Sequence, residues 1–270
     1  QSLFLGLTNP YTLMHEVENN LEVILLLVFM VAGIYFMKNL MLAIFTRLFL
    51  QIESKVLLSL LFCFVAAFLS AFLDALTVTA VLIGVGIGFY RIFHLATSGK
   101  GFDDDHNYLD DSSLNSLGRD QQENFKSFLR NLLMHGVVGT ALGGVCTIVG
   151  EPQNLLIANV ADWTFIEFLV VMSPITVPVF FAGMITCFSV EKLKIAGFGT
   201  QLPSEIKEIF ERYNDFRKSN LTDKDKTDLL IESIVGVLLI IALALHVAEV
   251  GIIGLGVIVL LTAFKGVTEE

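Results

Sequence analysis

Charge is scarce in this sequence of 270 residues: charged residues make up 16% of it, against 54% hydrophobic residues. Soluble domains carry about 25% charged residues. The composition therefore argues against an ordinary cytosolic enzyme, and the high apolar content excludes a disordered chain. The mean hydropathy of +0.73 indicates a polytopic α-helical membrane protein. Basic residues, 17 in number, are fewer than the 27 acidic residues. The resulting net charge of −10 argues against nucleic acid as a partner.

Cysteine is sparse as well. The three cysteines lie inside apolar stretches and are expected to be small buried residues, not disulfides or metal ligands: Cys63, Cys146 and Cys187. The sequence also lacks a zinc motif, a phosphate-binding loop and a hydrolase nucleophile elbow, so no cofactor is expected. The chain starts at Gln1 without a signal peptide and stops just beyond an apolar run. We therefore expect both ends to be cut.

Long apolar stretches are what the sequence has instead, and a helix needs about 20 such residues to cross a bilayer. They predict a first span at 23–37, two helices within 56–90, a broken span within 132–161, a proline-kinked span at 164–190, and a final pair at 229–245 and 251–264. The stretch 56–90 is tight for two full spans and favours a hairpin of shorter helices meeting inside the membrane. Pro152 interrupts the third stretch, and such a break survives at membrane depth only where it is buried in protein or lines a polar cavity.

The predicted fold class is thus an all-α polytopic membrane protein. Six segments divide the chain: 1–54 with the first span and an interfacial helix, 55–93 with the hairpin, 94–131 as an acidic loop, 132–191 with the broken helix and the next span, 192–228 as a charged segment with a helix, and 229–270 with two spans.

The basic residues predict the orientation of these spans. Of the 17, three lie in 38–55, five in 91–131, eight in 192–228, and the last is Lys265. Threading the chain through the predicted spans places all four groups on one side of the bilayer. Lys and Arg mark the cytoplasmic side, so we expect a multi-pass membrane protein with 1–20 outside.

Asp74 is the first of two acids that stand out at membrane depth, where an ionisable residue costs about 2.5–3.5 kcal/mol or more and is a functional hypothesis by default. It is the single charge in the stretch 56–90, and the hydroxyls of Ser70 and Thr77 lie on the same helical face. A carboxylate, hydroxyls and freed carbonyls are the oxygen ligands that a dehydrated cation requires. The alternative is that Asp74 caps the second helix of the hairpin, and one residue can do both.

Glu151 is the second acid, and it lies at the break itself. Gly150 precedes it, and Thr147 and Asn154 supply a hydroxyl and an amide nearby. Asp74 and Glu151 are therefore candidate Na⁺ ligands. The alternative for Glu151 is a charge at a helix N-terminus, which the helix dipole favours.

The remaining ionisable residues near the spans are weaker candidates. We expect Glu167 to be interfacial, Glu232 and Glu249 to be solvated near span ends, and His135 and His246 to be packed or wet, with a proton relay as the alternative for the histidines.

The two motifs carry a resemblance. Ser70 to Thr77 resembles the hairpin tip of the ion transporter superfamily, which includes NhaD-type and arsenite-type transporters. Gly143 to Asn154 resembles that superfamily's glycine-rich broken-helix loop. Most similar is the NhaB family of bacterial sodium/proton antiporters, which the stretches 15–18, 21–38, 68–78 and 266–270 also resemble. One departure is that Asp74 is followed by Ala75-Leu76-Thr77, where many superfamily members have Asn or Asp followed by Asn/Asp-Val-Thr.

The resemblance implies a fold and a set of functional residues. It implies that this chain is the N-terminal half of an inverted repeat whose second half is missing. The segments 55–93 and 132–191 would form a moving transport domain on a scaffold that is commonly dimeric in relatives. It carries functional roles onto Asp74, Ser70 and Thr77 at the tip, and onto Gly150, Glu151 and Asn154 in the loop.

The resulting hypothesis is secondary Na⁺/H⁺ antiport by alternating access. Asp74, with Glu151, would bind either Na⁺ or a proton, so competition for one site couples the two fluxes. Li⁺ is an alternative cargo. The first rival is a cation-coupled anion or dicarboxylate symporter of the same superfamily, although Asp74 repels an anion unless Na⁺ is bound. The second rival is an intramembrane enzyme, which would need a pair of aspartates where this chain has one.

Overall fold

The computed structural model describes residues 6, 8–19, 21–25, 28–29 and 37–265. This part of the chain is helical and contains no β-strand. Its α-helices are α1 (Pro10–Asn19), α2 (Leu21–Leu25), α4 (Lys38–Gln51), α5 (Lys55–Phe72), α6 (Ala75–Thr97), α7 (Ser116–Gly144), α8 (Pro152–Ala161), α9 (Phe165–Leu193), α10 (Ser204–Asn220), α11 (Asp223–Ala244) and α12 (Val250–Lys265). The all-α class is thereby confirmed.

Four of the described helices are long and apolar enough to cross a membrane: α5, α6, α9 and α11. The shorter helix α12 is also apolar over 250–264. The predicted span 23–37 lies largely outside the described residues. A multi-pass membrane protein is the architecture that these helices make.

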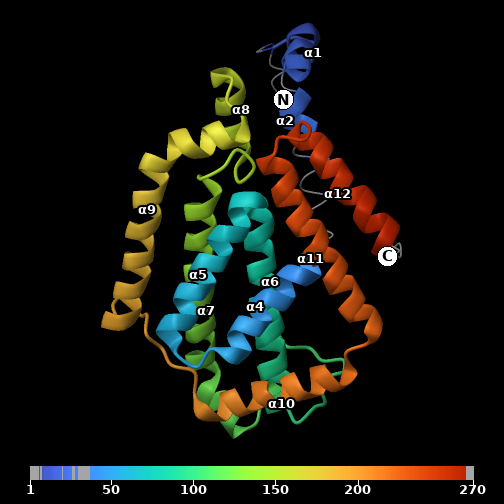
Figure 1. The fold of residues 1–270 in the computed structure, drawn as a ribbon. Coiled ribbons are helices and arrows are strands. Elements are labelled where there is room, and N and C mark those ends of the chain that lie inside the picture. Colours follow the sequence, from blue (N-terminus) through green and yellow to red (C-terminus); the bar gives the residue numbers. More distant parts are fainter. Residues whose placement is uncertain (1–5, 7, 20, 26–27, 30–36, 266–270) are drawn as a thin grey trace.

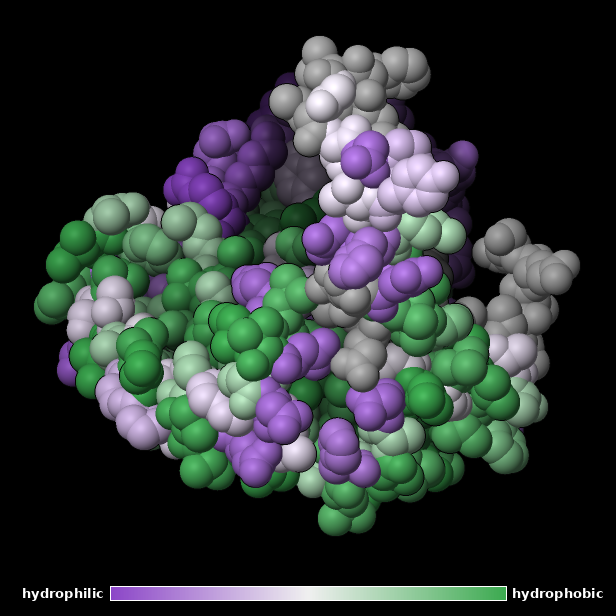
Figure 2. Space-filling view, turned by 90° about the horizontal axis from the view of Figure 1, so that it is seen from above, coloured by the Kyte–Doolittle hydropathy of each residue, from purple (hydrophilic) through white to green (hydrophobic). Residues whose placement is uncertain are grey.

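Connecting segments and short helices lie at the two ends of the helix bundle (Figure 1). The loop after α6 and the helix α10 lie at one end, and α8 and the α11–α12 turn lie at the other. The basic segments 91–131 and 192–228 therefore share an end, as the positive-inside count predicts. Seen from the α8 end, hydrophobic residues cover much of the surface, and hydrophilic residues gather at the upper left and in a band down the middle (Figure 2).

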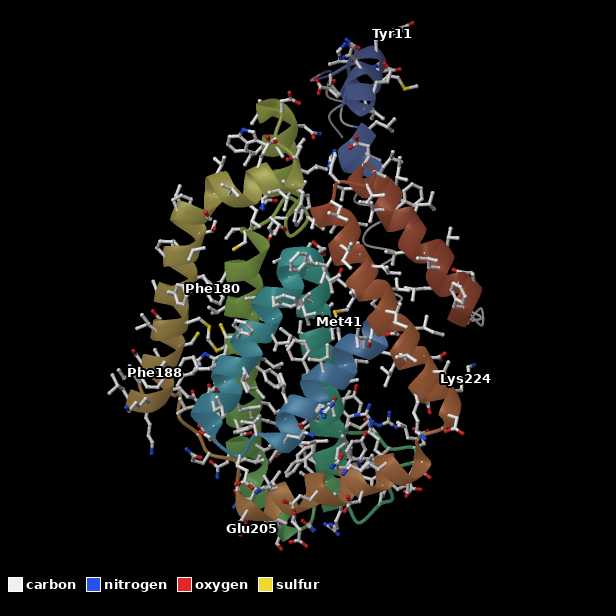
Figure 3. The ribbon with its side chains drawn as sticks, in the orientation of Figure 1. Tyr11, Met41, Phe180, Phe188, Glu205 and Lys224 are labelled. Carbon is white, nitrogen blue, oxygen red and sulfur yellow. The ribbon has the colours of Figure 1, made fainter. Side chains whose placement is uncertain are left out.

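The helix α9 forms one flank of the bundle, with Phe180 and Phe188 along its length (Figure 3). Its apolar side chains are largely exposed, as Ile175 at 63% and Ile185 at 64% illustrate. Exposed apolar side chains in such numbers are expected where the neighbour is lipid or another membrane segment.

The core lies between the hairpin α5–α6 and the helices α4, α7 and α10. Aromatic rings fill it: Phe49 of α4 stacks on Phe89 of α6 at 4.0 Å between centroids and meets Phe210 of α10 at 4.8 Å. Phe45 of α4 lies 5.1 Å from Phe62 of α5. The helix α4 therefore buries one face against the hairpin, and this face includes Met41, which is drawn inside the bundle in Figure 3.

The second arm of the hairpin is longer than the sequence suggested. We ended the apolar stretch at Tyr90 because Arg91 is charged, but α6 continues to Thr97. The continuation is stabilised by burial of Phe93 and Leu95 and by His94, whose Nδ1 lies 2.7 Å from Nε2 of His106. Each arm is thus long enough to cross a bilayer by itself.

The expected acidic loop 94–131 is shorter in the structure. The helix α7 starts at Ser116, where the Asn115 side chain accepts a hydrogen bond of 2.8 Å from the Gly118 amide as N-cap. The interior positions Phe125 and Phe128 bury this polar-looking segment against the core. By contrast, the helix predicted within 192–228 is confirmed as α10, which buries Ile206, Ile209 and Phe210.

Glu232 contradicts its prediction. We expected a solvated residue near a span end, but the side chain is fully buried, and its Oε2 accepts a hydrogen bond of 2.5 Å from the backbone amide of Leu40. The amides of the first turn of α4 have no partner within the helix, and a carboxylate from α11 serves one of them. Glu249 is exposed, as expected.

Candidate ion-binding site

The hairpin tip is formed by a single break between α5 and α6 at Leu73 and Asp74. Asp74 is the N-cap of α6, and its Oδ2 accepts hydrogen bonds from the backbone amide of Thr77 at 2.9 Å and from the Thr77 hydroxyl at 3.0 Å. The capping interpretation of Asp74 is therefore confirmed. The side chain is 8% exposed, so an ionisable group lies largely buried at the tip.

The break between α7 and α8 is the second element of the site, and it spans 145–151. The predicted interruption before Pro152 is confirmed, with Glu151 at the N-cap position of α8. The Asn154 amide nitrogen donates to the carbonyls of Gly144 at 3.0 Å and Thr147 at 2.8 Å, which folds the loop back onto the end of α7.

The tip and the break are in direct contact. The Ala75 amide donates to the Gly150 carbonyl at 3.3 Å, and the Thr147 hydroxyl donates to the Ala71 carbonyl. A Cβ atom on Gly150 would overlap the Gly144 carbonyl, so only glycine fits there. These contacts bring together residues that are about 75 positions apart in the sequence.

Glycines of α7 let this helix approach α5 closely. A Cβ at Gly143 would overlap the Ala67 carbonyl oxygen, and one at Gly139 would overlap that of Cys63. At the next glycine, Gly144, a Cβ would lie 3.1 Å from Glu151 Oε1 and 3.2 Å from Ser70 Oγ. The absence of a side chain at Gly144 thus leaves room for the carboxylate of the break beside the tip.

Four helix ends meet at this junction: the C-termini of α5 and α7 and the N-termini of α6 and α8. The N-termini carry partial positive charge, and each has an acid at its N-cap position, Asp74 and Glu151. The C-termini leave backbone carbonyls without helical partners. Carboxylates and freed carbonyls around one point are the ligands that broken helices offer to small cations in transporters.

Among the residues that the structure describes, neither carboxylate has a basic partner. In the part of the chain that the structure describes, the ion pairs involve neither Asp74 nor Glu151. Two acids that lack a counter-charge favour a proton or a cation and disfavour an anion.

All seven predicted site residues lie at the junction, but they differ in what they contact. Asp74 and Glu151 supply the charges. Thr147 and Asn154 use their donors to hold the loop, and Gly150 allows the close contact. Thr77 donates to Asp74, and the Ser70 hydroxyl donates to the Thr140 carbonyl at 2.8 Å.

Sequence reasoning missed Thr140, which is 3% exposed. Its hydroxyl lies 3.1 Å from that of Thr79, so it links α6 and α7 below the tip. The available signal in the sequence was a hydroxyl residue among the glycines of an otherwise apolar stretch of α7.

A second buried cluster was also missed, at the other end of the same helices. Glu191 of α9 lies 3.4 Å from Lys55 Nζ of α5 and 3.2 Å from His135 Nε2 of α7. The Gly199 amide also donates to Glu191 at 3.3 Å. All three side chains are at most 2% exposed. The available signal in the sequence was that Lys55 and Glu191 lie at the ends of predicted spans on the same side of the membrane. The sequence analysis counted Lys55 only among the cytoplasmic charges.

Comparison with known proteins decides the family. The model of the family "Bacterial Na+/H+ antiporter B (NhaB)" matches residues 1–270. The chain belongs to the NhaB family. It is 57% identical to the Na(+)/H(+) antiporter NhaB of Shewanella halifaxensis, over all of this chain and 51% of that protein. It is 55% identical to the NhaB proteins of Teredinibacter turnerae and Vibrio atlanticus, over 54% and 51% of their lengths.

The NhaB family is a family of transporters and not of enzymes. Membership therefore excludes the rival hypothesis of an intramembrane enzyme. The chain spans about half the length of the curated NhaB relatives that it matches. No solved structure matches the chain.

Proposed function

We propose that the full-length protein is a secondary Na⁺/H⁺ antiporter of the bacterial inner membrane. The observation that carries the proposal is the junction of the hairpin tip and the helix break, where Asp74 and Glu151 stand at two helix N-termini in contact and no ion pair of the described residues involves either acid. The names of the NhaB relatives support the same activity. Antiport of this kind would extrude sodium and serve pH and salt homeostasis.

Competition for the two carboxylates provides the coupling. A proton on Asp74 or Glu151 removes the charge that attracts Na⁺, and a bound Na⁺ opposes protonation of the same groups. Carboxylate and carbonyl oxygens suit a hard cation that has shed its water. Release of one ion and binding of the other, on opposite sides of the membrane, then exchanges Na⁺ for H⁺. Li⁺ fits the same chemistry and is a second cargo to be tested.

The moving part in this proposal consists of 55–93 and 132–191. The hairpin would be re-entrant, with its tip held at membrane depth by the contacts to Gly150 and Thr147. The second half of an inverted repeat would supply the rest of the site, in keeping with the half-length match to the relatives. Dimerisation through the scaffold helices follows from the resemblance to the superfamily. The rival anion symporter is disfavoured, because two acids without a counter-charge repel an anion.

The experiment measures Na⁺-driven proton movement in vesicles that contain the full-length protein. We expect Asp74→Asn to abolish exchange, because the amide cannot take up a proton or neutralise Na⁺. The matched control is Asp162→Asn, an exposed acid that follows α8 outside the junction, and it should exchange like the wild type. Glu151→Gln should lower the apparent Na⁺ affinity. Wild-type exchange in Asp74→Asn would overturn the assignment, and uptake of a dicarboxylate would favour the symporter.

A further inference from the structure

An apolar groove of about 620 Å³ runs between α6 and α7 on the outside of the helix bundle. Ile83 and Ile87 form its α6 wall, and Met134 and Val138 form its α7 wall. These side chains are 42–49% exposed. The groove is distinct from the ion-binding junction, because none of the seven site residues lines it.

Cationic and aromatic residues close one end of this groove. Lys126 and Arg130 of α7 line it beside the rings of Tyr90 and Tyr108. Lys126 Nζ lies 5.5 Å from the centre of the Tyr90 ring. This end is the one shared with the basic segments 91–131 and 192–228 (Figure 1), which the positive-inside rule places on the cytoplasmic side.

The charges at this end remain accessible. Arg130 donates to the neutral hydroxyl of Ser127 at 3.2 Å and is exposed. Lys126 lies 3.5 Å from Glu123, one helical turn away, but both side chains are exposed, so this contact is weak. The facing acid is Asp111, whose Oδ1 accepts a hydrogen bond of 3.5 Å from the Tyr90 hydroxyl.

The length of the groove fits one leaflet of a bilayer. Its apolar part on α7 extends from Leu129 to Val138, a rise of about 14 Å at about 1.5 Å per residue. Half of a hydrocarbon core of about 30 Å is about 15 Å. The groove thus offers an apolar channel as long as one leaflet, with cations at the level of its phosphate groups.

We propose that the groove binds one anionic phospholipid of the cytoplasmic leaflet. An acyl chain lies between Ile87 and Val138, and the phosphate contacts Lys126 and Arg130. Basic pockets between membrane helices on the cytoplasmic side are suited to such head groups, and the charge of each cation strengthens binding. Tyr90 and Tyr108 fit the boundary between the apolar chain and the polar head group, since each has an apolar ring and a polar hydroxyl.

The test uses the full-length protein, purified in detergent and exchanged into phosphatidylglycerol or phosphatidylcholine, with retained lipid measured by native mass spectrometry. We expect retention of phosphatidylglycerol over phosphatidylcholine. The double variant Lys126→Gln and Arg130→Gln should lower this preference about tenfold or more. The matched control, Lys218→Gln with Lys224→Gln, removes two exposed cations elsewhere and should retain the wild-type preference.

A second variant tests the apolar part. Ile87→Trp fills the groove and should reduce lipid retention, whereas Ile241→Trp on α11, a residue that is 47% exposed, should not. Equal retention of the two lipids would overturn the proposal, as would unchanged retention in both groove variants. Absence of retained lipid in the full-length protein would also overturn it and would indicate that the remainder of the protein covers the groove.

Discussion

Two polar clusters lie at opposite ends of the same helices, and their acids differ in their counter-charges. At the α8 end, the ion pairs of the described residues involve neither Asp74 nor Glu151. At the α10 end, Glu191 contacts both Lys55 and His135. Both clusters connect the hairpin arm α5 or its tip to α7, so the packing of the helices does not explain the difference.

The difference indicates which acids are available to an ion. A carboxylate that is already neutralised by a buried lysine offers little to Na⁺, and removal of its partner leaves an uncompensated charge. Within the described residues, Asp74 and Glu151 are stabilised by helix dipoles and by hydrogen-bond donors and not by an ion pair. We therefore interpret the Glu191 cluster as a structural clamp of α5, α7 and α9, and the Asp74 junction as the exchangeable site.

The largest expected effect on stability comes from breaking the clamp. Glu191→Gln should lower the stability of the purified protein by about 3–5 kcal/mol, because it leaves Lys55 buried without its counter-charge. Heat-induced unfolding in detergent measures this loss. The added change Lys55→Met should recover part of it, and Glu205→Gln, at an exposed acid of α10, should have no effect. Unfolding of Glu191→Gln at the wild-type temperature would show that the cluster is not a clamp.

The second effect concerns the close contact that places the break beside the tip. Gly143→Ala should cost about 1–3 kcal/mol through overpacking, because the new methyl group overlaps the Ala67 carbonyl of α5. Antiport should fall with it, since the end of α7 must move away from Ser70. The control is Gly84→Ala in α6, where a methyl group meets no atom within 4 Å. If both variants unfold and transport alike, the approach of α5 and α7 does not depend on glycine.

The stability of the variant Asp74→Asn tests whether the two clusters differ in role. This change should alter stability by less than about 1 kcal/mol, because asparagine caps a helix about as well as aspartate, while antiport is lost. The measurement is the same heating experiment, run in parallel with Glu191→Gln. A loss as large as that of Glu191→Gln would assign Asp74 a structural role.

The ion-binding junction could be predicted from the sequence because both acids interrupt long uncharged stretches. Asp74 and Glu151 were found by their cost in an apolar environment, and the prediction of a break before Pro152 follows from the missing backbone donor. Their roles as ion ligands stay a prediction. That the tip contacts the break could not be derived from either motif alone, since the contact depends on Gly139 and Gly143 fitting against α5.

The clamp could not be predicted for a related reason. Lys55 and Glu191 stand at the edges of apolar stretches, where a charge is normally solvated, and local pattern does not distinguish a solvated edge from a buried pair. The same limit explains the error at Glu232, which lies next to a polar segment but caps α4 from another helix. Partners that are more than a hundred residues away in the sequence decide both cases.

The smallest expected effect on stability comes from a solvent-exposed ion pair that lies beside the clamp. Lys207 lies 2.7 Å from Glu53, and their side chains are 44% and 81% exposed. The hydrogen bond and charge of Lys207 lower the pKa of Glu53 below its usual 4.5, and Glu53 raises the pKa of Lys207 above 10.5. The pair therefore stabilises the fold between about pH 4.5 and pH 10.5, and this stabilisation is lost as the pH falls through the lowered pKa of Glu53.

Replacing this lysine tests whether burial separates the two lysine–glutamate pairs. Lys207→Met should lower the unfolding temperature at pH 7 only slightly, far less than Lys55→Met, because exposed pairs are screened by solvent and salt. The small difference from the wild type should shrink at high salt and as the pH is lowered below 4.5. A difference that persists under both conditions would mean that the lysine stem stabilises the fold by packing near Phe210 and Leu202, which line the same small cavity. The contrast between the pairs would then reflect contact area and not the burial of charge.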